Sequence, residues 1–334
     1  MQTNKTPLVT VAIVAWKRFE PLKNAIKSVL NQTFQDFEIL VIAEADKELF
    51  KQVKKICDDF SDPHIRVEQR EKRGISHGRN YGIKNAKGKY LAYLDEDDEF
   101  LPIKLEKHIN ILEKSKDDVI LTYAQHYAWD RQNNYRVITP LIKDARDGDI
   151  FDYALRRFFQ KSILFQIWDA VFKMKYVKDM ELDTSLDTAE DDFLLRLLKR
   201  GKCEFIPEVL HIQYLDSEDS PSNAIVDFTK ISKDYRKDII DNKQAEIIYE
   251  KHLDYIKKHE IIYNRINSKA KNFITRGTRI IRMGNMREGR KHILFAIKLK
   301  PSFYAIFIYL LSFLGKNFFI KALRIRQRFI GGLG

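Results

Sequence analysis

The sequence predicts an α/β fold in which helices flank a mostly parallel sheet. Over the first 215 residues or so, apolar runs rich in β-branched residues alternate with segments of helical apolar spacing. One such run leads directly into five consecutive acids, Asp95 to Glu99, at the kind of strand end where doubly wound sheets bind ligands. After about residue 224 the strand patterns stop, and Lys- and Arg-rich helical periodicity predicts a basic α-helical tail.

The strands are predicted from short apolar runs. LVTVAIVA (8–15) and FEILVIA (37–43) are typical of buried strands because β-branched residues dominate them. The other predicted strands are 64–68, 89–94, 118–125, 203–206 and 208–214.

The helices are predicted from apolar spacing of three and four residues. Leu22, Ile26 and Val29 indicate a helix between the first two strands. The other predicted helices are 46–59, 75–86, 103–115, one near 150–159, and 189–200 ending at Gly201. Strands that alternate with helices favour right-handed βαβ connections, whereas 126–175 has a mixed pattern.

The charge of the chain is concentrated at one end. The net charge is +12, yet residues 261–334 contain sixteen Lys and Arg against one acid, Glu288, while the first 260 residues sum to −3. We therefore expect two parts, an α/β domain at 1–223 and a basic helical region at 224–334. Such a basic region favours a polyanionic partner, either an anionic membrane surface or nucleic acid.

The cysteines and the N-terminus bear on the compartment. Cys57 and Cys203 lie far apart in the sequence without metal-type spacing, which fits a reducing compartment. No apolar run precedes the first strand, so we expect no secretory signal and a cytoplasmic location.

The stretch GKYLAYLDEDDEFLP (88–102) places repelling carboxylates together at a strand end. A hard divalent cation such as Mg²⁺ or Mn²⁺ explains this arrangement, because it takes one or two carboxylates together with phosphate and water. The alternative is a solvated acidic turn that caps the following helix, whose N-terminus favours anions.

A second acidic group occurs in LDTAEDDFLLRLLKRG (186–201). Its acids, Glu190 to Asp192, begin a predicted helix with a buried leucine face. Acids in a first helical turn are stabilised by the helix dipole, so capping alone accounts for them as well.

Three segments carry a family resemblance. LVTVAIVAWKR, AIKSVLNQTFQDFEILVIAE and RGISHGRNYGIKNAKGKYLAYLDEDDEFLP resemble, in order and spacing, the nucleotide-sugar-binding half of family 2 glycosyltransferases. The resemblance covers roughly 8–115, continues more weakly to about 215 and does not extend to the tail. It implies the GT-A fold, a Rossmann-like sheet flanked by helices, and an inverting transferase.

The resemblance assigns roles to the acidic turn. Asp95 and Asp97 become the two ends of the family's D-x-D motif, with Asp97 as the ligand of Mn²⁺ or Mg²⁺ and Asp95 nearer the ribose or the metal. Glu96 is placed at the ribose. Arg79 is placed at the base or the phosphates, and the alternative for Arg79 is a surface ion pair.

The chain departs from the family pattern at two strand ends. Val14 to Lys17 stand where the family usually has Pro-Thr-Tyr-Asn, so Trp16 can stack on a base but a threonine hydroxyl is absent. Ala43 and Glu44 replace two aspartates, and Glu44 keeps a carboxylate that could accept a hydrogen bond from uracil. The donor-binding set is therefore expected to include Val14, Trp16 and Glu44, with UDP favoured.

The second acidic segment resembles the catalytic segment of the family. There Asp191 corresponds to the general base and Glu190 to an acceptor-binding neighbour. His211 is interpreted as structural. Trp168 and Asp169 are weak candidates for the acceptor side.

The tail segment 301–332 begins with a twelve-residue apolar run, Phe303 to Leu314, shorter than the roughly 20 residues that span a bilayer. Apolar and aromatic residues beside Lys321 and Arg324 favour an interfacial helix, so we expect peripheral contact of 301–330 with the inner face of the cell membrane. The alternative is packing on the catalytic domain or on another subunit.

Together these features predict a metal-dependent inverting glycosyltransferase that moves a sugar from a nucleotide-diphosphate donor to a glycan or lipid-linked acceptor. The alternative is a non-catalytic protein that binds a polyanion or a membrane surface and has a degenerate site. No nucleic-acid partner is expected, since few aromatics lie among the basic residues. A nucleotidyltransferase would need a Gly-rich basic loop, which WKRFEP (16–21) lacks.

Overall fold

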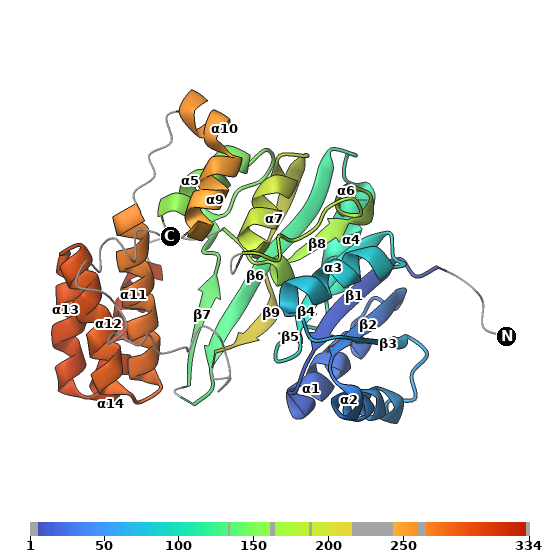
Figure 1. The fold of residues 1–334 in the computed structure, drawn as a ribbon, viewed down its shortest axis with the longest axis horizontal. Helices are drawn as coiled ribbons and strands as arrows, with labels where there is room; N and C mark the ends of the chain where they lie inside the picture. The colour runs from blue at the N-terminus through green and yellow to red at the C-terminus, as the bar shows by residue number, and fades with distance from the viewer. Residues whose placement is uncertain are drawn as a thin grey trace. The chain divides into compact units, whose positions relative to one another are not determined.

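The computed structural model describes residues 6–132, 134–160, 164–186, 189–215, 243–259 and 265–331 (Figure 1). Its first half alternates strands and helices at the predicted places, within two residues at each end. The elements are β1 (Val9–Ala15), α1 (Phe19–Leu30), β2 (Phe37–Glu44), α2 (Lys47–Asp59), β3 (Ile65–Arg70), α3 (Ile75–Asn85) and β4 (Tyr90–Asp95).

One nine-stranded sheet organises this part of the chain, with the order β3-β2-β1-β4-β8-β6-β9-β5 and β7 beside β6. The first four strands are parallel, which confirms the α/β prediction. Antiparallel pairs β4–β8, β6–β8 and β5–β9 extend the sheet. The later strands are β5 (Glu99–Phe100), β6 (Val119–Asp130), β7 (Tyr135–Thr139), β8 (Ala170–Lys173) and β9 (Lys202–Tyr214).

The predictions for the second half of this domain need two corrections, the first being that the strand expected at 118–125 is longer and runs as β6 from Val119 to Asp130. The two strands expected at 203–206 and 208–214 are a single strand, β9. Pro207 within it is exposed, and a proline can remain in a strand where the ladder does not need its nitrogen as a donor. The helices of this half are α4 (Lys104–Lys114), α5 (Phe151–Gln160), α6 (Met174–Val177) and α7 (Ala189–Leu198).

The parallel strands β1, β2 and β4 are buried on both faces, and close packing of α3 against the sheet depends on glycine. A Cβ on Gly78 would lie 2.6 Å from Cγ1 of Val14 in β1, inside any normal contact distance. At Gly82, one turn later, the nearest atom is the Cβ of Ala12 at 3.3 Å. The absent side chain at Gly78 therefore lets the first turn of α3, which also carries Arg79, lie directly on the carboxyl end of β1.

The chain divides into two compact units. One comprises 1–128, 136–154 and 164–214, and the other comprises 129–135, 155–163 and 215–334. The predicted boundary at 223/224 lies outside the described residues.

The described residues from 243 to 331 are largely helical. The helices are α9 (Lys243–Lys251), α10 (Leu253–Lys258), α11 (Arg265–Arg282), α12 (Met286–Leu299), α13 (Phe303–Leu311) and α14 (Lys316–Gly331). Helices α11 to α14 pack into one bundle (Figure 1). Gly277 and Gly289 allow α11 and α12 to approach closely, since a Cβ on Gly277 would lie 2.7 Å from the carbonyl oxygen of Gly289.

We expect the substitution Gly78→Ala to destabilise the protein by about 1–3 kcal/mol, the usual cost of overpacking a filled core. Thermal unfolding would show a clear fall in Tm. Gly82→Ala on the same helix is the matched control and should cost less, because its nearest contact is longer. Trimming the obstructing side chain in the double variant Val14→Ala/Gly78→Ala should recover part of the loss. Equal effects of the two glycine substitutions would contradict this account.

Candidate active site

The acidic turn lies near the middle of the sheet, at the carboxyl end of β4. This strand pairs with β1 on one side and with β8 on the other. The backbone N–H of Asp98 donates to the carbonyl of Asp95 at 3.1 Å, which closes the turn before β5. The parallel strands β1 and β2 end at the same edge of the sheet as β4, so Trp16, just after β1, and Glu44, the last residue of β2, lie at the edge that carries the acidic turn.

The two ends of the D-x-D motif each contact an arginine. Asp95 accepts a hydrogen bond from Nη2 of Arg79 at 2.7 Å. Asp97 forms an ion pair with Arg18, the residue that precedes α1. Both carboxylates remain partly exposed, so their oxygens are accessible to a ligand.

Glu96 points back toward β1 and is buried. One of its oxygens accepts the backbone N–H of Trp16 at 2.8 Å. Burial raises the pKa of Glu96 to about 7. The indole ring of Trp16 is partly exposed and has Nζ of Lys72 3.6 Å from its centroid, so a base that stacks on this ring would share it with a lysine.

Glu44 occupies the end of β2 as predicted, and it is buried. Its carboxylate accepts the backbone N–H of Gly74 at 2.8 Å, which links β2 to the start of α3. Burial raises the pKa of Glu44, against the opposing effect of the Gly74 hydrogen bond. Gly74 has a φ of 105°, a conformation that favours glycine.

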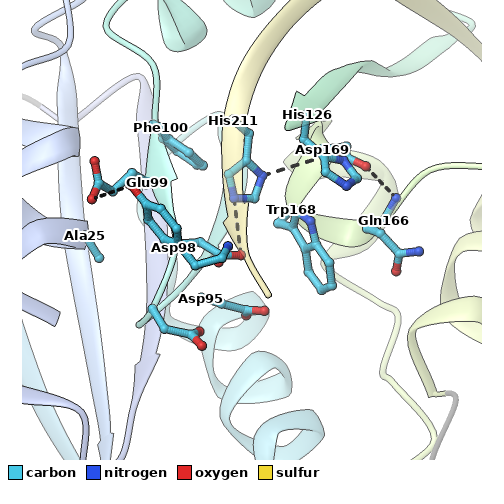
Figure 2. Close-up of polar contacts among 12 residues, drawn as sticks. Ala25, Asp95, Asp98, Glu99, Phe100, His126, Gln166, Trp168, Asp169 and His211 are labelled. Carbon is cyan, nitrogen blue, oxygen red and sulfur yellow. Dashed lines mark hydrogen bonds and ion pairs between the residues drawn. The ribbon is translucent and has the colours of Figure 1, made fainter. Parts of the chain in front are cut away.

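Asp98 belongs to a buried polar network whose contacts the sequence analysis did not predict (Figure 2). His211 of β9 stands between two carboxylates, with Nε2 3.4 Å from Asp98 and Nδ1 3.8 Å from Asp169. Both separations exceed an ordinary hydrogen bond. Burial lowers the pKa of His211 to about 4, so its ring is neutral at neutral pH. Burial, followed by the charges of Asp95 and Asp97, raises the pKa of Asp98 well above its usual value.

Asp169 is the best-bonded member of this network and is fully buried. It accepts the backbone N–H of Gln166 at 2.8 Å, and Nδ1 of His126 lies 2.7 Å from its other oxygen. Burial alone would raise the pKa of Asp169, but the two histidines outweigh it and hold that pKa below its ordinary range. The sequence contained one signal for this network: His126 lies within a largely apolar strand, which indicates a buried polar partner but does not identify it.

Lys104 is a second buried group that the sequence analysis did not single out. Its Nζ donates to the carbonyl of Trp168 at 3.0 Å and lies 4.6 Å from the centroid of Phe100. Burial lowers the pKa of Lys104 to about 8, and Asp169 opposes that shift. Trp168 is thus held through its backbone, with its ring beside His211 (Figure 2).

Arg79 brings the two acidic segments of the sequence together. Its guanidinium is 1% exposed and forms ion pairs both with Asp95 of β4 and with Glu190 in the first turn of α7. The rings of Tyr93 and Trp168 lie 5.8 and 5.9 Å from it. The alternative considered for Arg79, an ion pair at the surface, is therefore wrong: Arg79 does form ion pairs, but its guanidinium is buried. The predicted contact of Arg79 with donor base or phosphate stays a prediction.

Asp191 and Asp192 differ in their environments. Asp192 is fully buried and accepts Nε of Arg196 at 2.8 Å, one turn along α7. Asp191 is only partly buried, and its pKa is raised to about 7 by burial and then by the charge of Asp192. A carboxylate with a pKa near 7 is suited to accept a proton near neutral pH.

The acidic turn offers the right donors for a hard divalent cation. Asp95 and Asp97 are two partly exposed carboxylates, the number that Mg²⁺ typically takes from protein when phosphates complete its shell. Across the described part of the chain, no group of three or more His, Cys, Asp or Glu side chains is arranged to hold a metal ion. The residues therefore fit a cation that is held jointly with a diphosphate.

Comparisons with known proteins agree with this geometry. The family model described as Glycosyl transferase family 2 matches residues 10–178, about half of the chain. An uncharacterized glycosyltransferase of Methanocaldococcus jannaschii is 28% identical over 212 residues, which is 61% of this chain and 69% of the relative. The putative colanic acid biosynthesis glycosyl transferase WcaA of Escherichia coli is 26% identical over 62% of this chain and 74% of its own.

Other relatives are much longer than the matched region. An uncharacterized glycosyltransferase of Rickettsia bellii is 33% identical over 143 residues, and the match spans 43% of this chain. Three relatives from Rickettsia species are 32–33% identical to this chain over 133–148 residues. The chain spans only 20% to 41% of the length of these three relatives.

Solved structures share the fold. The S. aureus TarS 1-349 structure in complex with UDP-GlcNAc has a TM-score of 0.51 and 14% identity and covers 89% of each chain. The mannosyltransferase PcManGT of Pyrobaculum calidifontis, in complex with GDP-Man and Mn²⁺, has a TM-score of 0.50 and 12% identity over 96% of this chain and 87% of its own. These likenesses confirm the predicted GT-A fold.

We expect Asp169→Asn to destabilise the protein by about 1.5–3 kcal/mol, the range for losing hydrogen bonds to a buried charge. Thermal unfolding at pH 7 measures this loss. Because the pKa of Asp169 is depressed, the difference from the parent should be complete above about pH 4, the unfolded value, and shrink as the pH falls below it.

The control for this prediction is Asp117→Asn, which removes an exposed carboxylate paired with Lys175. Exposed ion pairs contribute little to stability, so this variant should unfold close to the parent. If Asp169→Asn were no more destabilising than Asp117→Asn, the buried network would not hold this part of the site together.

Proposed function

The chain belongs to glycosyl transferase family 2, and we propose that it transfers a sugar, with inversion, from a nucleotide-diphosphate donor to a hydroxyl of a glycan or lipid-linked acceptor. The observation that carries this proposal is the position of Arg79. Its two ion pairs hold the acidic turn after β4 and the first turn of α7 around one guanidinium. An inverting displacement needs both groups at one site, since the donor and the base must reach the same anomeric carbon.

The donor end is assigned to the edge formed by β1, β2 and β4. Trp16 offers a ring for stacking, Glu44 a carboxylate for a base N–H, and Glu96 a carboxyl near the ribose. UDP is favoured by the carboxylate at Glu44. Among the solved neighbours, one holds UDP-GlcNAc and another GDP-Man, so the choice for this chain rests on its own residues.

The leaving diphosphate is assigned to Asp95 and Asp97. A Mn²⁺ or Mg²⁺ ion held by these carboxylates would neutralise the negative charge that develops on the leaving diphosphate. The oxygens of Asp95 and Asp97 are partly exposed, which supports this assignment. Arg79, already beside Asp95, adds a fixed positive charge on the protein side.

Asp191 is assigned as the general base. It removes the proton from the acceptor hydroxyl as that oxygen attacks the anomeric carbon and the bond to the diphosphate breaks. Its raised pKa supports this role, because a carboxylate with an ordinary pKa is a weak proton acceptor at neutral pH. Glu190 is held by Arg79 beside it and is assigned to the acceptor side.

A non-catalytic protein with a degenerate site is not favoured. The carboxylates of both acidic segments are present and are linked through one buried arginine, an arrangement that binding of a polyanion does not require.

We expect Asp191→Asn to reduce transfer by about 10²–10⁴-fold while leaving donor affinity nearly unchanged, because the base acts on the acceptor and not on the donor. Transfer assays and donor-binding calorimetry measure the two effects separately. The control Glu181→Gln removes an exposed acid that pairs with Lys84 on the surface, and it should leave both intact. Loss of donor binding in Asp191→Asn would contradict the role of this residue as the base.

The pH dependence follows from the same assignment. Asp191 must be deprotonated to act, and its pKa is about 7, so activity should fall about tenfold per pH unit below 7 and level off above it. A profile of kcat/KM from pH 5 to 9 tests this. Glu96 has a similar pKa, so the profile is repeated with Glu96→Gln, in which the acidic limb should persist. A limb near pH 4, or one abolished by Glu96→Gln, would contradict the assignment.

A further inference from the structure

Helix α13 and the residues that follow it expose large apolar side chains. Phe303 is 96% exposed, Phe307 53%, Leu310 61% and Leu314 59%. Ile306, Phe313 and Phe318 are exposed as well. Single exposed apolar residues are common, but a group on neighbouring turns marks a surface that contacts something other than water.

The spacing of these residues places them on one side of the helix. Phe303, Phe307, Leu310 and Leu314 are separated by four, three and four residues, which is the repeat of a single helical face. This face continues from α13 into the short 3₁₀ turn η5 (Ser312–Leu314).

The opposite face of α13 is already used. Ala305, Ile308 and Leu311 are buried, and Ile308 and Leu311 pack in a cluster with Ile281, Ile293 and Phe319. The helix is thus anchored in the bundle by one apolar face and presents a second apolar face outward. Core packing accounts for the first face only.

Basic residues lie on α12 and α14 near this outward face. Lys316 follows η5, and Lys321 lies one turn after the exposed Phe318 in α14. The guanidinium carbon of Arg290 lies 4.6 Å from the centroid of Phe313. The single acid in 261–334, Glu288, has its carboxylate paired with Lys291.

We propose that α13, η5 and the first turn of α14 form a docking surface for an anionic lipid bilayer, with the apolar face inserted among the acyl chains and the flanking basic residues at the headgroups. Apolar and aromatic side chains beside Lys and Arg are the pattern of helices that lie in a membrane interface. None of the described helices is long and apolar enough to cross a bilayer. This proposal does not depend on the reaction proposed above.

A second copy of the chain is the main competing occupant of this face. Residues 261–334 contain sixteen basic residues and one acid, so two such segments brought face to face would repel each other. An anionic lipid surface instead complements that charge. Charge complementarity therefore selects the membrane over self-association.

The test is cosedimentation of the full chain with vesicles of phosphatidylcholine alone and of phosphatidylcholine with 30% phosphatidylglycerol. We expect binding to the anionic vesicles that weakens with added salt, and much weaker binding to the neutral ones. The triple variant Phe303→Gln/Phe307→Gln/Leu310→Gln should reduce binding at least tenfold, because three inserted side chains are lost while glutamine keeps the helix propensity.

Two further variants make the test specific. Ile142→Gln alters a residue that is 64% exposed outside this helical bundle, and it should bind vesicles like the parent. Lys316→Gln/Lys321→Gln should weaken binding to anionic vesicles roughly tenfold or more, at about fivefold per charge, and leave neutral vesicles unaffected.

Light scattering without lipid measures the oligomeric state and so distinguishes a lipid bilayer from a second copy of the chain as the occupant of this face. A monomer that binds anionic vesicles supports the proposal. A dimer that the triple variant dissociates would overturn it in favour of a second copy. Vesicle binding that is unchanged in the triple variant, in a protein with the Tm of the parent, would also overturn it.

Discussion

The buried guanidinium of Arg79 is the constraint on which the site depends. A cation out of contact with water is costly unless it is well paired, and removing one partner of such a pair commonly costs about 3–5 kcal/mol. Arg79 is paired with Asp95 of β4 and Glu190 of α7, which are distant in sequence. Its own carbonyl accepts the hydroxyl of Tyr93 at 2.8 Å. The fold therefore has to bring both acidic segments to one point, and that requirement places the first turn of α7, which also carries Asp191, beside the acidic turn after β4.

Separate partners explain how five consecutive acids are tolerated at the end of a buried strand. Each carboxylate contacts a different polar group, and these contacts offset the repulsion among the five acids. Asp95 and Asp97 face arginines, and Glu99 accepts the hydroxyl of Tyr214 at 3.1 Å. Glu96 and Asp98 are buried and have raised pKa values, which reduces the number of full negative charges near neutral pH. Of the partly exposed members, Asp95 and Asp97 are the two that we propose hold a cation together with a diphosphate.

Sequence reasoning predicted the elements of the parallel half because their apolar runs are continuous and their helices are amphipathic. The two acidic segments stand out in the linear pattern, and the family resemblance singled out Asp95, Asp97 and Asp191 within them. It did not predict the network of His126, Asp169 and His211, because three segments bring those residues together only through the order β8-β6-β9. Nor did periodicity show that α13 has two apolar faces, one packed and one exposed, since both faces consist of the same residue types.

The most direct test of the central claim, a nucleotide-sugar donor site at this sheet edge, is the binding of UDP, GDP, CDP and dTDP by calorimetry and thermal shift, each with Mn²⁺, Mg²⁺ or EDTA. The account predicts that one diphosphate, UDP, raises the Tm through mass action, that it does so only with a divalent cation, and that Asp97→Asn abolishes the shift. Equal, metal-independent binding of all four diphosphates, or full binding by Asp97→Asn, would contradict it.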